Sequence, residues 1–186
     1  MGGRKRYIDP TLPLKRESPV NLPRLLREGF VAGLIGAGAV ALWFLIVDLV
    51  AGRAFYTPAM LGSAVFLGLR DPADVVVTFQ AVIGYTMLHV LAFCFVGFAG
   101  ALLARLVERF PTTFFVVVVF FAIFEVGFYI VVALAGQPLL GALAWSNVAI
   151  GNLIAAGGMG YYLWSVHPEL RAELAAHPLG ETMDGE

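Results

Sequence analysis

Four long apolar segments constrain this chain more than any other feature of its sequence. They occupy about residues 29–51, 76–104, 112–136 and 139–164. Each is longer than the roughly 20 residues that an α-helix needs to cross a hydrocarbon core about 30 Å thick. None alternates apolar and polar residues as a membrane β-strand does. The sequence therefore predicts an all-α integral membrane protein built as a four-transmembrane-helix bundle.

The composition also indicates a bilayer rather than water as the solvent. Of the 186 residues, 60% are hydrophobic and 13% are charged, whereas soluble domains average about 45–50% and about 25%. This chain lacks the polar surface of an ordinary cytosolic enzyme and the basic face of a nucleic-acid binder. Its single cysteine, Cys94, excludes an intrachain disulfide and a multi-cysteine metal site, and we predict no metal site.

Three polar or short segments lie outside these spans. Residues 1–28 form a basic, proline-rich arm that we expect to become helical near Asn21, a good N-cap. In the first outer connection, Thr57-Pro58 predicts the start of a short helix over about 57–69, which is too short to span and is therefore interfacial or re-entrant. Asp71-Pro72 predicts the start of the second span, and we expect a tight turn over about 105–111. Residues 165–186 form a polar tail after the membrane domain, 29–164.

The basic residues predict the orientation of the bundle. With the N-terminus inside, ten of the twelve Lys and Arg residues lie on the cytoplasmic side, and only Arg53 and Arg70 lie outside. The positive-inside rule then places both termini in the cytoplasm. The pattern resembles that of small bacterial inner-membrane proteins, so we expect a multi-pass protein of a bacterial-type inner membrane.

Small side chains predict where the helices approach each other. Transmembrane helices associate where glycine and alanine allow their backbones to come close. Such residues recur at four-residue spacing on the first, second and fourth spans; the candidate packing positions are Gly29, Gly33, Ala37, Gly97, Gly151 and Ala155. The third span is rich in Phe and Val, and we expect it to face lipid or a partner.

Polar residues within the spans are costly and are the candidate site. At 1.5 Å per residue, His89, Glu125 and Asn152 lie about 18–22 Å from the cytoplasmic end of their helices. Asp48 and Tyr85 lie about 28 Å deep, with Tyr129 near that level. We therefore hypothesise a buried cluster of His89, Glu125 and Asn152, capped by Asp48, Tyr85 and Tyr129. It either sets helix register, carries protons or a solute, or presents His89 as a single pigment ligand.

The sequence contains no catalytic motif of the common families, which leaves enzyme activity open but disfavoured. The favoured function is a non-catalytic accessory subunit of a larger membrane complex, for which a respiratory or photosynthetic electron-transport assembly is the host we expect. The alternatives are a small proton or solute carrier using Asp48, His89 and Glu125, and a protein that binds a chlorophyll-type pigment or quinone through His89. Expected partners are membrane lipids and other membrane subunits or copies of the chain, without nucleic acid. The residues expected to contact lipid head groups or a partner are Arg4, Lys5, Arg6, Lys15 and Arg16.

Overall fold

The computed structural model describes residues 21–109, 115, 119, 126, 145–168 and 171–172. This part of the chain is helical and contains no strand, which confirms the all-α prediction for it. The elements are α1 (Leu22–Val50), α2 (Tyr56–Leu67), the 3-10 turn η1 (Pro72–Asp74), α3 (Phe79–Arg109) and α6 (Trp145–Val166). Within the described ranges, α1 and α3 are long and apolar enough to cross a membrane.

Several predicted features lie outside the described residues. They include most of the predicted third span, with Glu125 and Tyr129, and the arm residues Arg4, Lys5, Arg6, Lys15 and Arg16. Of the third span only Phe115, Val119 and Val126 are described, and all three are helical and exposed. These predictions stay predictions.

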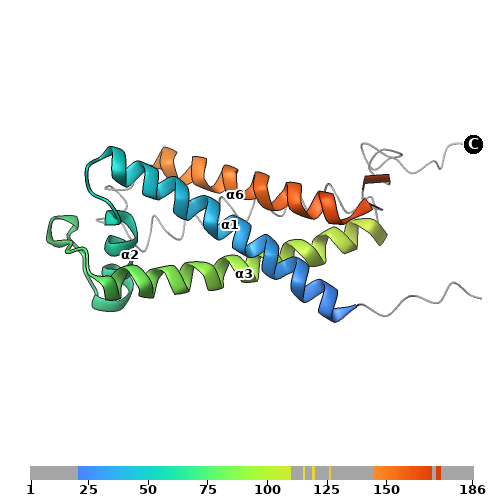
Figure 1. Ribbon diagram of the computed structural model, residues 1–186, viewed down its shortest axis with the longest axis horizontal. Helices are drawn as coiled ribbons and strands as arrows, with labels where there is room; N and C mark the ends of the chain where they lie inside the picture. Colours follow the sequence, from blue (N-terminus) through green and yellow to red (C-terminus); the bar gives the residue numbers. More distant parts are fainter. Residues whose placement is uncertain are drawn as a thin grey trace, which may run out of the picture.

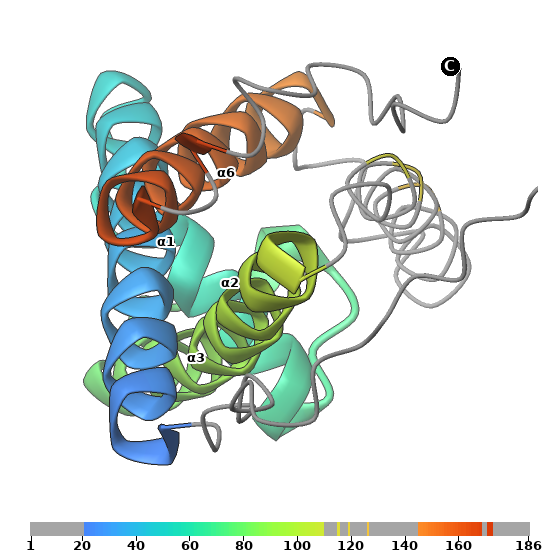
Figure 2. The same ribbon diagram turned by 90° about the vertical axis from the view of Figure 1, so that its right-hand side faces the viewer.

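The three long helices run along one another (Figure 1). The beginning of α1 lies at the same end as the last turns of α3 and α6, so α1 is antiparallel to both. The short helix α2 lies at the opposite end, beside the end of α1 and the beginning of α3. Seen from the end, α1 packs against both other long helices, while α3 and α6 touch each other little (Figure 2).

Glycines bring α1 and α3 into backbone contact. A Cβ atom on Gly33 would lie 2.6 Å from the Cα of Cys94, and one on Gly97 would overlap the main chain of Gly29. A Cβ on Gly29 would overlap the side chain of Phe98 and lie 2.8 Å from its Cα. The structure therefore places Gly29, Gly33 and Gly97 at one close crossing, as expected for helices that associate through small residues.

Helix α6 packs on α1 through a mixed apolar and polar contact. Ala32, Met159 and Leu163 belong to one buried cluster, which Ala101 of α3 joins. Towards the α2 end, a Cβ on Gly151 would lie 3.1 Å from Cδ1 of Trp43. The indole Nε1 of Trp43 donates a 2.8 Å hydrogen bond to the carbonyl of Asn147. Ala37 and Ala155 are also buried, so all six predicted packing positions are buried.

The structure differs from the predicted helix starts and ends at three places. Thr57 is not the N-cap of α2, because this helix begins one residue earlier and Phe55 occupies the cap position. Asp71 does accept a capping hydrogen bond, from the amide of Ala73, but it caps η1, and α3 begins only at Phe79. At its other end α3 continues to Arg109, so much of the predicted 105–111 turn is helical.

Candidate functional site

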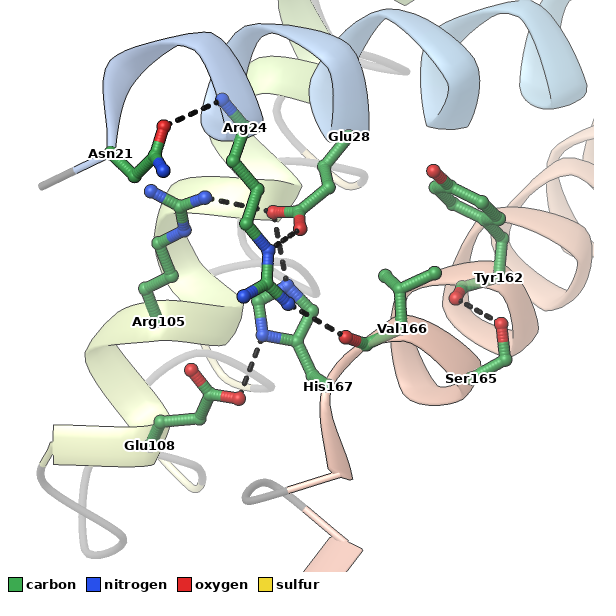
Figure 3. Close-up of polar contacts among 9 residues, drawn as sticks. All are labelled: Asn21, Arg24, Glu28, Arg105, Glu108, Tyr162, Ser165, Val166 and His167. Carbon is green, nitrogen blue, oxygen red and sulfur yellow. Dashed lines mark hydrogen bonds and ion pairs between the residues drawn. The ribbon is translucent and has the colours of Figure 1, made fainter.

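A buried carboxylate lies where α1 begins and where α3 and α6 end. Glu28 is 1% exposed. Its Oε1 accepts a 2.6 Å hydrogen bond from Nε of Arg24, and its Oε2 accepts a 2.9 Å bond from Nη2 of Arg105 (Figure 3). Burying an ionised carboxylate is costly unless its charge is balanced and its oxygens accept hydrogen bonds. The two guanidinium groups meet both requirements for Glu28.

The two arginines contribute differently to this arrangement. The side chain of Arg24 is 51% exposed and lies one helical turn before Glu28 on the same helix, so water screens much of that pair. The side chain of Arg105 is only 18% exposed and comes from α3. The Arg105–Glu28 pair is therefore the one that joins two helices in a region of restricted hydration.

His167 adds the third helix to this group. It is the residue directly after α6 and is 2% exposed. Its Nδ1 lies 2.7 Å from Oε1 of Glu108 on α3, and its Nε2 lies 3.4 Å from Oε2 of Glu28 on α1. Nη2 of Arg24 also donates to the carbonyl of Val166, the last residue of α6. We call Arg24, Glu28, Arg105, Glu108 and His167 the ion cluster; it links α1, α3 and α6.

A second buried carboxylate lies near the opposite end of α1. Asp48 is 3% exposed. One of its oxygens accepts a 2.7 Å bond from the amide of Thr57, and the other accepts a 2.7 Å bond from the Thr57 hydroxyl. Thr57 lies in the first turn of α2, where backbone amides have no partner within the helix. Asp48 accepts from one of these amides and so takes the role that an N-cap side chain usually has. It fixes α2 against α1.

His89 lies within α3 and contacts α1. Its Nε2 is 3.2 Å from the carbonyl oxygen of Ala37. Since a carbonyl only accepts, Nε2 carries a proton and donates it to this bond. The ring also stacks on Tyr85 and is tilted against Phe93, with centroids 5.8 Å and 4.8 Å away. Only Nδ1 is then left to bind a pigment metal or a quinone.

The described residues do not test the predicted cluster of His89, Glu125 and Asn152 as a whole. His89 and Tyr85 do share one face and are in contact. Asp48 is bound to Thr57, and Asn152 is half-buried on α6. Glu125 and Tyr129 lie outside the described ranges, so their pairing with His89 stays a prediction.

The ion cluster was missed by sequence reasoning. From the sequence alone, Glu28 belongs to the basic arm, Arg105 to a predicted turn and His167 to the polar tail. A usable signal was present, because Arg24 and Glu28, and likewise Arg105 and Glu108, have the spacing of neighbours on one helix face. Extending each apolar segment by one or two helical turns would have brought these pairs to one end of the bundle.

The chain matches no protein-family model, no curated protein and no solved structure.

Proposed function

We propose that this chain is an integral membrane protein whose long helices span the bilayer. Only 28% of the residues in the most apolar stretch of α1 and of α3 are buried within the protein, which is unlike the core helix of a soluble protein. Large apolar side chains project outward instead, among them Leu42, Phe95 and Leu153. Lipid acyl chains would cover such a surface without the cost of exposing it to water.

Charge supports the orientation in which the ion cluster lies at the cytoplasmic side. Among the described residues, Arg24 and Arg27 lie near the beginning of α1, Arg105 and Arg109 lie at the end of α3, and Arg171 follows α6. Arg53 and Arg70 lie in the connection at the other end, together with Asp71 and Asp74. The positive-inside rule favours this placement in a bacterial-type inner membrane.

Within the membrane we propose a non-catalytic role as a subunit of a larger assembly. One observation carries this proposal: the ionisable side chains characterised on the described helices bind the chain's own helices together. Glu28 is bound by Arg105, Asp48 by Thr57, and His89 by the carbonyl of Ala37. Groups held in this way stabilise the bundle. A carrier would need some of them to exchange partners with its cargo.

The outer face of α6 is the surface we propose for a partner's transmembrane helix. Gly157 and Gly160 are exposed there, and so are Leu153, Tyr161 and Trp164. Positions 153, 157, 160, 161 and 164 follow the three- and four-residue spacing of one helix face. Exposed glycines between bulky side chains form a surface on which another helix can approach closely.

The apparent mass of the chain extracted from its native membrane in mild detergent tests this proposal. We expect the wild type to migrate in an assembly much larger than the 20.0 kDa chain. Gly160→Leu should release it, because the added side chain would obstruct the approach of a partner helix. Gly38→Leu, at an exposed glycine of α1, should leave the assembly intact.

Extraction of the chain without partners would favour the alternative function, a small proton or solute carrier. A chain that is extracted alone, and that dissipates a proton gradient in liposomes unless His89 is replaced, would contradict the subunit proposal. An absorbance spectrum of the same preparation tests whether a pigment is bound.

A further inference from the structure

The turn between α1 and α2 carries an arginine that its neighbours hold in place. The guanidinium carbon of Arg53 lies 4.0 Å from the centre of the Tyr56 ring. The Tyr56 hydroxyl donates a 3.0 Å hydrogen bond to the carbonyl of Pro72, and the amide of Arg53 donates to the carbonyl of Asp48. A guanidinium packed over a ring keeps its N–H groups available as donors. Arg53 is exposed, so it presents these donors in a fixed place at the surface.

No carboxylate among the described residues pairs with Arg53. The nearest acidic residue in the sequence is Asp48, and both of its oxygens are bound by Thr57. The ion pairs that the described residues form belong to the ion cluster, at the other end of the bundle. The ligand that best fits such a guanidinium is an oxyanion, and a phosphate can accept two of its N–H bonds at once.

Apolar side chains flank this arginine on both sides in the sequence. Val50, the last residue of α1, is almost fully exposed, and Phe55 is half exposed. Phe55 also has a left-handed backbone, with φ 62°, whereas the other described residues with positive φ, Gly52 and Gly68, are glycines. A bulky side chain is disfavoured in this conformation, and burial within the protein does not compensate for it here. Apolar surroundings outside the protein would.

The position of the turn along α1 indicates what those surroundings are. From Gly29, where the apolar segment begins, to Val50, α1 rises about 32 Å, which matches a hydrocarbon core about 30 Å thick. Val50 therefore lies at the boundary of the hydrocarbon, and Arg53 lies just beyond it, at the level of the lipid phosphates. The turn is at the end of the bundle opposite the ion cluster (Figure 1), which is the outer side in the proposed orientation.

We propose that the turn over residues 51–56 is a phospholipid-binding site of the outer leaflet. The guanidinium of Arg53, held over Tyr56, donates to the phosphate of the lipid, and an acyl chain of the same lipid covers Phe55 and Val50. The site rests on the proposed insertion of the long helices in a membrane. Inorganic phosphate shares the charge of this ligand but has no acyl chain, so it fits only half of the site.

Native mass spectrometry of the full chain in mild detergent, with phosphatidylglycerol added, tests the proposal. We expect the wild type to retain the lipid and Arg53→Gln to bind it about tenfold more weakly, because a charge-assisted contact is lost. The matched control is Arg70→Gln, which removes an exposed arginine of the same connection and should bind as the wild type does. A wild type that retains no lipid, equal binding by Arg53→Gln, or an equal loss in Arg70→Gln would overturn the proposal.

Phe55→Gly tests the apolar half of the site without endangering the fold, because glycine adopts a left-handed backbone at no steric cost. We expect this variant to bind phosphatidylglycerol more weakly than the wild type. In a separate arm, added inorganic phosphate should not displace the lipid. Displacement by phosphate, or unchanged binding in Phe55→Gly, would show an anion site without an acyl chain and would contradict the proposal. Lipid retained equally by the wild type and every variant would remove this site and leave the proposed membrane insertion standing.

Discussion

Replacing Glu28 with glutamine is expected to lower the free energy of unfolding by about 3 kcal/mol, the lower end of the range for removing one member of a buried ion pair. The substitution conserves shape but leaves the guanidinium of Arg105 without its carboxylate. Most of this loss comes from breaking the Arg105–Glu28 pair, because the Arg105 side chain is only 18% exposed. Arg24 contributes little, since it is half exposed and can turn to water. Unfolding in mixed micelles, followed by circular dichroism, measures the change.

Asp74→Asn is the control for Glu28→Gln, because it removes one negative charge from an exposed position. Its effect should stay within about 0.5 kcal/mol. If Glu28→Gln were as mild as the control, the cluster would not be holding the helix ends together, and its role in the bundle would have to be abandoned.

The second large effect is expected for Gly33→Ala. The new methyl group would lie 2.6 Å from the Cα of Cys94 and 2.7 Å from the carbonyl oxygen of Phe93. Both are backbone atoms that cannot rotate away, so α1 and α3 must separate. Overpacking that forces side chains and backbone to shift costs about 1–3 kcal/mol. Here we expect a loss at the upper end of that range, measured in the same unfolding assay.

Gly38 provides a matched control on the same helix. A Cβ at Gly38 meets nothing within 4 Å, so Gly38→Ala tests helix propensity without the contact. Alanine is favoured over glycine in a helix by about 0.5–1 kcal/mol, so this variant should be neutral or slightly more stable. Equal losses at the two positions would show that the α1–α3 crossing is not where the glycines indicate.

Features of the fold are predictable from the sequence where a single physical effect determines them. Long apolar runs predict helices, and Asn21 was correctly recognised as the N-cap of α1, where its side chain accepts from the amide of Arg24. The small residues marked the crossing because close backbone approach requires them. The positions of Gly29, Gly33 and Gly97 therefore indicate where α1 and α3 cross, which composition alone does not.

The candidate site was harder to predict because it depends on contacts between distant segments. Glu28 and Arg105 are separated by 77 residues, and nothing local marks them as partners. Asp48 illustrates a second reason. Its depth suggested a place in an intramembrane cluster, but the short helix α2 brings Thr57 to it. Depth along one helix does not reveal which neighbouring element reaches a side chain first.

If the outward apolar faces of the long helices lie in lipid, a spin label on Leu91 will be surrounded by acyl chains. Leu91 is 68% exposed near the middle of α3. The label is attached to Leu91→Cys in a Cys94→Ala background and compared with Arg70→Cys in the connection. In membranes, we predict that relaxation at Leu91 responds to oxygen, which concentrates in lipid, and not to a water-soluble nickel chelate, whereas position 70 responds to the chelate. A label at Leu91 that is relaxed by the chelate as strongly as one at position 70 would show that this face of α3 is in water and that the helix does not span the bilayer.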